Sequence, residues 1–220
     1  PAGSPSELVP WTPPSKAIRR RHVSTHGGQI DLRMSFRTPG SRDDLAPAIE
    51  LLLRVIDDGM STRLYHRLVD EGGMVYDCSA QWEPFVEVGA LDLHATVHHL
   101  RVDAVVASCL DMVDDLRRTG PRSDEVEKAK HRQRWDLEAT LDDPEHLAQT
   151  VGAAVLFERP LSLRALADRY DRVGPEEVRQ AARTIFQRRC LHAATIGRLS
   201  GPSGQRVREI LRTWRVRRAS

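Results

Sequence analysis

The sequence is short of the residues and runs that build several common kinds of protein. Its 220 residues include only three cysteines, Cys78, Cys109 and Cys190, which are odd in number and far apart. That spacing favours neither a disulfide framework nor a CxxC zinc or redox site, so we expect the thiols to serve as small buried apolar groups. No run of eighteen apolar residues occurs, and we therefore predict no membrane span.

The sequence also lacks a marked excess of charge of one sign. The formal net charge is only +2, which predicts no strong overall field for nucleic acid. Positive charge gathers at the two ends, and WRVRR at 214–218 is the most basic short run near the C-terminus. A short basic run without interleaved aromatic residues is weak evidence for nucleic-acid contact, so we expect no nucleic-acid partner.

Motifs for phosphate, dinucleotide, hydrolase and zinc sites are missing too. The sequence has no GxxxxGK, GxGxxG or GxSxG motif. The pairs His22/His26 and His94/His98 are four residues apart in runs typical of extended chain, where four residues span about 13 Å and cannot share one zinc ion. The side chains of the adjacent His98 and His99 are expected to point apart. We therefore predict no catalytic residue and no metal ligand in this chain.

What the sequence does contain is an ordinary globular balance, with 40% apolar and 29% charged residues. Residues 1–19 are rich in proline and predict an extended linker. QIDLRMSFRT at 29–38 alternates apolar and polar residues as a half-buried antiparallel strand does. Helical spacing follows at 45–56, and a second helix is predicted from about Ser61, its N-cap, to Glu71, with Gly72-Gly73 ending it.

The rest of the chain predicts a hairpin, several helices and a closing strand. Strand-like runs at 75–82 and 86–97 are separated by Glu83-Pro84. Helical patterns then occupy 102–116, 123–141, a segment from Pro144, 162–173 and 175–186, followed by a strand at 190–197 and a basic helix or tail at 201–220. This order predicts an α+β fold, an antiparallel sheet of about five to six strands with helices packed on one face.

One stretch, GMSTRLYHRLVDEGGMVY at 59–76, carries a more specific signal. It follows a strand ending FRTPG and a helix ending DDGM, and it precedes another strand. In this order it resembles the C-terminal, non-zinc-binding half of the pitrilysin and insulinase-type zinc peptidases, the inverzincins. PRSDEVEKAK at 121–130 and GPEEVRQAARTIF at 174–186 extend the resemblance over about 20–200.

The resemblance implies a half-domain that works with another half. Members are built from homologous α+β halves that face each other across a peptide-binding chamber, and the N-terminal half carries the HxxEH zinc motif. This chain contains no HxxEH. Its nearest approach is DDPEH at 142–146, where Asp142 stands at the first histidine position and far from the family's motif. Zinc is therefore expected on a partner half, in the same chain or a separate subunit, with no cofactor here and no activity alone.

The resemblance also assigns roles to two positions. The non-zinc half contributes a tyrosine and an arginine to the substrate, and Tyr76 stands at the tyrosine position, where a phenol can donate to an oxyanion. The arginine position is Val69, which has no donor. Arg67 is expected to project about 200° from position 69 around a helix, and Arg63 should share the face of Arg67. For both arginines we expect solvent or contact with Asp58 or Asp70.

Two hypotheses remain open at this point. In the first, the chain is the non-catalytic half of a zinc peptidase, closes the chamber over a peptide and contributes Tyr76 to substrate binding. In the second, it is a degenerate member that only scaffolds a partner. Val69 favours the second and Tyr76 the first. Because the chain opens at Pro1 without methionine, we expect a piece of a longer protein. A homo-oligomer is compatible with either hypothesis, and the sequence indicates neither compartment nor substrate.

Overall fold

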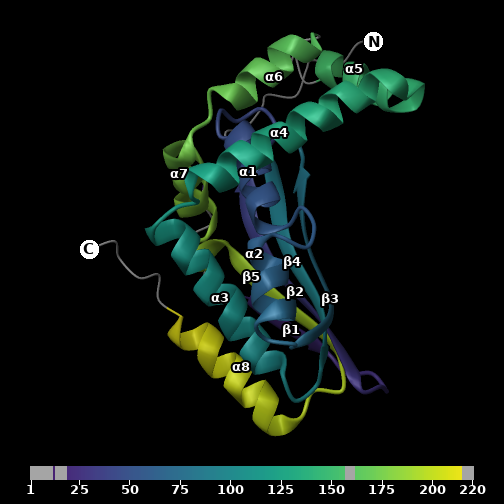
Figure 1. Ribbon diagram of the computed structural model, residues 1–220. Helices are drawn as coiled ribbons and strands as arrows, with labels where there is room; N and C mark the ends of the chain where they lie inside the picture. The colour runs from purple at the N-terminus through teal and green to yellow at the C-terminus, as the bar shows by residue number, and fades with distance from the viewer. Residues whose placement is uncertain (1–11, 13–18, 157–161, 215–220) are drawn as a thin grey trace.

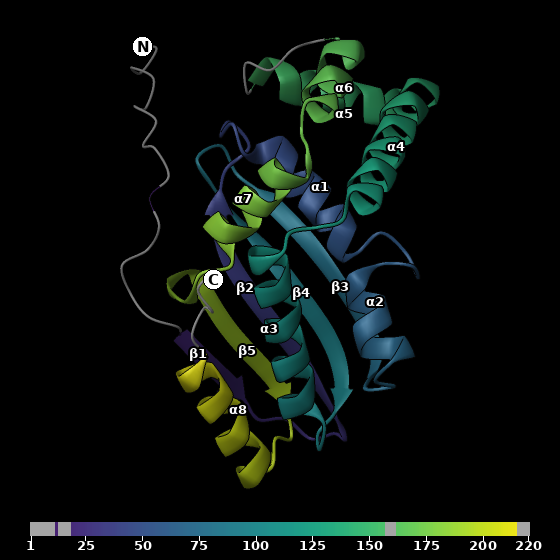
Figure 2. The same ribbon diagram turned by 60° about the vertical axis from the view of Figure 1, so that its left-hand side comes forward.

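A five-stranded sheet with helices over one face forms the body of the protein (Figures 1 and 2). The computed structural model describes residue 12, residues 19–156 and residues 162–214, so most of the expected linker and the last residues of the tail lie outside the described residues. The strands, in the spatial order β1-β5-β2-β4-β3, are β1 (Arg19–Val23), β2 (Gln29–Pro39), β3 (Val75–Pro84), β4 (Val88–His98) and β5 (Leu191–Gly197).

The helices follow the predicted order along the chain. They are α1 (Ala46–Ile56), α2 (Arg63–Tyr65) continued by a π-helical turn (His66–Asp70), α3 (Val102–Arg118), α4 (Ser123–Ala139), α5 (Pro144–Leu156), α6 (Leu163–Asp171), α7 (Pro175–Ile185) and α8 (Gly201–Thr213). In Figure 2, α1, α3, α7 and α8 lie in front of the sheet, while α4, α5 and α6 extend beyond one end of it. The opposite face of the sheet, the open face, carries no helix among the described residues. The α+β fold with helices on one face is confirmed.

The sheet differs from the prediction in one strand. β1 pairs with β5 in parallel, whereas the other pairs are antiparallel. The segment RRRHV carries no strand signal because four of its five residues are charged or polar. Its pairing is decided by the neighbouring strand rather than by its own propensity, a common outcome at a sheet edge.

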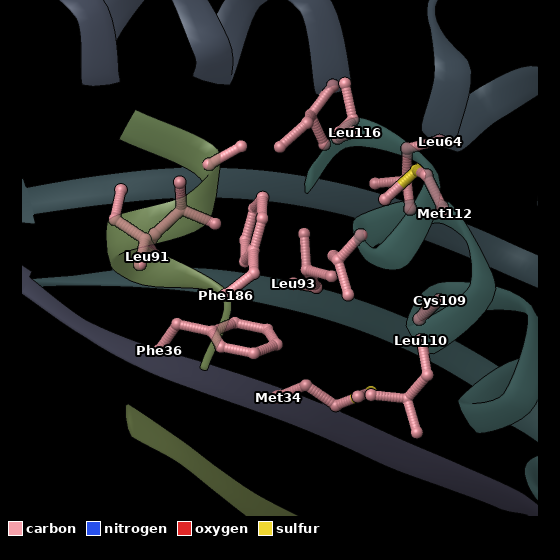
Figure 3. Packing of buried hydrophobic residues seen from close by; sticks show 14 of the residues in the cluster. Met34, Phe36, Leu64, Leu91, Leu93, Cys109, Leu110, Met112, Leu116 and Phe186 are labelled. Atoms are coloured by element: carbon pink, nitrogen blue, oxygen red, sulfur yellow. The ribbon is translucent and has the colours of Figure 1, made fainter. Parts of the chain in front are cut away.

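The core lies between the sheet and the helices that cover it. Alternate residues of β2 point inward, as the period-two pattern predicts, and Phe36 meets Phe186 edge-on with ring centroids 4.9 Å apart (Figure 3). Leu93 from β4 and Leu110 from α3 join the same cluster. The helix and strand patterns therefore meet in one continuous core.

The C-terminal helix α8 contributes to that core. Val207, Leu211 and Trp214 are buried, and the Trp214 ring lies 6.4 Å from that of Phe36 between centroids. The Trp214 indole N–H also donates to the Asp114 carboxylate at 3.0 Å. The basic segment from residue 201 is thus, as far as Trp214, an integral helix of the domain.

The cysteines are free thiols. Cys109 and Cys190 are buried, as expected for small apolar groups, and Cys78 is half-buried against the core. Burial, with smaller contributions from Asp57 and Asp77, raises the pKa of Cys78 to about 11, so the thiolate is scarce at neutral pH. Among the described residues, no helix combines the length and apolar character that crossing a membrane requires.

Candidate functional site

Residues 59–76, which carry the family resemblance, contain a short α-helix that continues into a π-helical turn. The helix begins at Arg63, with Thr62 in extended conformation before it, rather than at an N-cap of Ser61. The Glu71 N–H donates to the His66 carbonyl five residues back, at 2.9 Å, which is the π-helical pattern. Nothing in the residue pattern distinguishes this turn from an ordinary α-helix, so the sequence prediction of one continuous α-helix was wrong here.

Gly73 ends this helix, as predicted. Its φ of +47° lies in the left-handed region that favours glycine, and its N–H donates to the Val69 carbonyl at 2.9 Å. Arg101, at the start of α3, holds the turn from outside by donating to the carbonyls of Gly73 at 3.1 Å and Gly72 at 3.4 Å. The sequence did not predict this contact of Arg101, because only the fold brings residue 101 next to residues 72 and 73.

Tyr76 lies at a β-bulge directly after this turn. Val75 pairs with Val97 and Asp77 pairs with Thr96, so Tyr76 is the extra residue between two consecutive partners on β4. A bulge of this kind re-aims the side chain it carries. The Tyr76 side chain is 63% exposed and makes no hydrogen bond to the described part of the chain. Its phenol is therefore available to a ligand.

Val69, at the position where the resembling family carries arginine, is half-buried on the π-turn. Arg63 and Arg67 line one hollow of about 810 Å³ beside α3 and α4, which confirms that they share a face. Val69 does not line that hollow. Arg67 is thus no substitute for an arginine at 69, as the helical spacing predicts.

Arg63 is a structural anchor between helices. Its guanidinium donates to both carboxylate oxygens of Glu125, at 2.8 and 2.7 Å, and to Asp115 at 2.9 Å. For Arg63, the expectation of solvent or of contact with Asp58 or Asp70 was wrong, because its partners come from α3 and α4. Burial opposes ionisation of Glu125, yet hydrogen bonds from Arg63 and from the Arg122 backbone outweigh it and hold the Glu125 pKa below its usual range.

The histidines do not assemble a zinc site. His94 and His98 lie on β4, so the extended backbone separates them as expected. His98 and His99 do not point apart as predicted, since their rings lie 4.2 Å apart where the chain leaves β4. The Nδ1 of His98 faces the Leu100 N–H and the Nδ1 of His99 faces the Gly28 carbonyl. Among the described residues no three histidine, cysteine or acidic side chains group closely enough to hold a metal ion. The family resemblance assigns the zinc to a partner half rather than to this one.

Fold and turn together define a metallopeptidase-like half-domain with an accessible tyrosine at a bulge and, among the described residues, no metal-ligand cluster. Residues 2–133 match the family model described as "Peptidase M16 inactive domain". This chain belongs to the M16 peptidase family, as a C-terminal half-domain of the inactive type, in agreement with the resemblance drawn from residues 59–76.

Relatives with curated names support the assignment. The chain is 26% identical over 176 residues to an uncharacterized zinc protease of Mycobacterium bovis, covering 80% of this chain and 40% of the relative. An uncharacterized zinc protease of Streptomyces coelicolor is 25% identical over 148 residues, covering 67% of this chain and 32% of that protein. The chain therefore spans less than half the length of these relatives.

Solved structures share the fold at lower identity. The M16 inactive domain from Pseudomonas fluorescens superposes with a TM-score of 0.76 at 16% identity, covering 84% of this chain and 44% of that one. A putative zinc protease from Bordetella pertussis superposes with a TM-score of 0.66 at 19% identity, covering 77% of this chain and 94% of that one. These likenesses support the fold.

Proposed function

We propose that this domain is the non-catalytic half of a zinc peptidase and closes a peptide-binding chamber over an HxxEH-bearing half. The observation that carries the proposal is Tyr76, an exposed phenol at a bulge, directly after a turn fixed by Gly73 and Arg101. A phenol held in this way can donate a hydrogen bond to a peptide carbonyl oxygen as negative charge develops on it. The partner half, on the same chain or a separate subunit, supplies zinc. This chain supplies one side of the peptide-binding chamber and the hydrogen-bond donor Tyr76.

Val69 supports a second candidate, a scaffold that holds a partner without contacting substrate. Its side chain carries no hydrogen-bonding group, so one of the two substrate contacts expected in this family is missing. The loss of one transition-state donor costs about 3 kcal/mol, roughly a hundredfold in rate, so a slow peptidase remains compatible with Val69. The two candidates differ in whether Tyr76 affects turnover.

The test combines this chain with an HxxEH-bearing half and measures cleavage of an internally quenched, unstructured peptide with and without a zinc chelator. We expect chelator-sensitive cleavage that needs both halves, and Tyr76→Phe should lower kcat/KM about a hundredfold. Tyr65→Phe, on α2 beside the same turn, is the matched control and should leave kcat/KM unchanged.

A gain-of-function variant sharpens the test. Val69→Arg restores the donor type at that position, and under the peptidase proposal it should raise kcat. Cleavage that is insensitive to Tyr76→Phe would remove the substrate role of Tyr76. No cleavage in any combination, with the two halves shown to associate, would support the scaffold instead.

A further inference from the structure

The open face of the sheet carries a group of arginines and several carboxylates, and two of the carboxylates, Asp31 on β2 and Asp92 on β4, lie between the edges of the sheet. Four arginines point to this face from the side of β1 and β2, and they are Arg19, Arg21, Arg33 and Arg37. The acidic residues Asp77 and Glu83 lie on β3 at the other edge. We call the group of arginines the arginine face. Its cations gather on one half of a sheet surface that no described helix covers.

Strand register places small side chains at the centre of the arginine face. Arg33 on β2 and Arg21 on β1 both pair with Ala194 of β5, so they flank it from opposite sides. Their backbones are about 10 Å apart, twice the strand spacing. Ser35 and Arg19 flank His192 in the next row. A hollow of about 520 Å³ lies here, floored by Ala194 and Ser35.

The arginines of this face are weakly neutralised. Arg33 has one carboxylate, Asp92, at 3.6 Å between Nη1 and Oδ2. Arg19, Arg21 and Arg37 make no ion pair within the described ranges of the chain. Burial, and then the charges of Arg19 and Arg37, lower the pKa of His192, so the field of these cations is felt at the middle of the hollow. Unpaired guanidinium groups around a concave floor suit carboxylates, which they can bind with two hydrogen bonds.

We propose that the arginine face binds the carboxylate side chains of an acidic, extended peptide segment, and so gives the domain a preference for acidic substrates. The proposal rests on the proposed function, in which a peptide lies against this half-domain. In an extended peptide alternate side chains are about 7 Å apart, and the alternate residues Arg19 and Arg21 on β1 have the same spacing. A peptide with acidic residues at alternate positions can therefore meet successive arginines along the strand.

The division of charge favours a peptide over a nucleic acid. A polyanion long enough to cross the sheet meets Asp77 and Glu83 on β3, which repel it. A peptide can place its acidic residues over β1, β5 and β2 and neutral or basic residues over β3. The small net charge of the chain agrees with a local rather than a global preference for anions.

The test measures binding to this chain alone by fluorescence anisotropy, with a labelled peptide in which glutamate alternates with serine. A peptide with glutamine in place of glutamate is the matched ligand. We expect the glutamate peptide to bind about tenfold more tightly at low salt, with the difference shrinking as salt rises. Arg19→Gln/Arg21→Gln, which removes the two arginines whose spacing matches the peptide, should abolish the preference. Arg132→Gln/Arg212→Gln removes the same charge from exposed positions on α4 and α8 and should preserve it.

Two outcomes overturn the proposal. Equal binding of the glutamate and glutamine peptides removes the charge preference, and a single-stranded oligonucleotide that binds more tightly than the glutamate peptide identifies the face as a nucleic-acid site. Because this assay needs no catalytic partner, its result is separable from that of the cleavage assay. Acidic preference without cleavage overturns the proposed function alone, and cleavage without acidic preference overturns this inference alone.

Discussion

Arg63 on α2 and Glu125 on α4 are joined by two parallel hydrogen bonds of 2.8 and 2.7 Å, a fork that ties the turn before Tyr76 to the helical layer. Glu125 also accepts the Arg122 backbone N–H at 2.7 Å at the start of α4. One carboxylate therefore serves both a helix start and an interhelical ion pair, and its loss affects both.

We expect Glu125→Gln to lower the free energy of unfolding by about 1–3 kcal/mol at neutral pH, since it weakens a charge-assisted pair that is largely buried. The Glu125 pKa is depressed in the folded state, so the stabilisation is present above pH 4.5 and is lost as the pH falls through the folded pKa. Urea denaturation at several pH values measures this. Glu138→Gln, at an exposed position of the same helix that makes no ion pair within the described residues, should change stability by less than about 0.5 kcal/mol. Equal effects of the two variants would contradict the assignment.

Asp57 should give the opposite pH dependence. Burial raises its pKa above 3.8 despite the hydrogen bond from the Ala80 N–H, and Asp58 and Asp77 add to the shift. The folded state therefore favours the protonated acid, and stability falls as the pH rises from 3.8 through the folded pKa. Asparagine keeps an oxygen that can accept from Ala80. We expect Asp57→Asn to be more stable than wild type at pH 7 and equal to it at low pH, again by urea denaturation. A variant that is less stable at pH 7 would show that the charge itself is needed.

Two glycine substitutions should act with opposite signs. Gly73 has a φ of +47° and open space where an alanine methyl group would lie, so Gly73→Ala carries backbone strain alone and should cost about 1 kcal/mol. Gly152 lies inside α5, also with open space, and Gly152→Ala should gain up to about 1 kcal/mol. Thermal unfolding measures both. Equal shifts of the two midpoints in one direction would contradict the helix-ending role of Gly73.

Two tryptophan substitutions distinguish the effect of losing a buried hydrogen bond from the effect of replacing an exposed indole ring by a smaller one. Trp214→Phe removes the donor to Asp114 in a buried setting and should cost about 1–3 kcal/mol. Trp135 on α4 is 62% exposed, and Trp135→Phe should be nearly neutral. Chemical denaturation with far-UV circular dichroism reports both, independently of tryptophan fluorescence. A neutral Trp214→Phe would mean that packing alone attaches the end of α8 to the core.

Sequence patterns predicted the parts of this fold that depend on local chemistry. Pro175 begins α7, with the Glu177 carboxylate accepting the Gly174 N–H at 2.9 Å, and the alternation in β2 identifies its buried face. The features that the sequence patterns did not predict depend on contacts between residues that are far apart in the chain. β1 has no apolar alternation and is held by β5, and Arg101 reaches the Gly72-Gly73 turn only because β3 and β4 pair.

The site was predictable to a similar extent. The sequence singled out Tyr76 and the valine at position 69 as candidate positions, since both follow from the order of residues in one segment. It did not predict the bulge that exposes Tyr76, because a bulge is defined by the register of two strands. The partners of Arg63 were missed for the same reason, as Asp115 and Glu125 lie on other helices.

The position of β5 between β1 and β2 has a consequence for how the chain folds during synthesis. Among the strands of the described sheet, β5 is synthesised last, yet it is the only neighbour in that sheet of β1, which is synthesised first. The β2-β4-β3 part can form as soon as residue 98 is available, whereas β1 must wait for residues 191–197. Such a long-range closure is entropically slow, so the nascent domain exposes an edge of β2 until residues 191–197 have been synthesised.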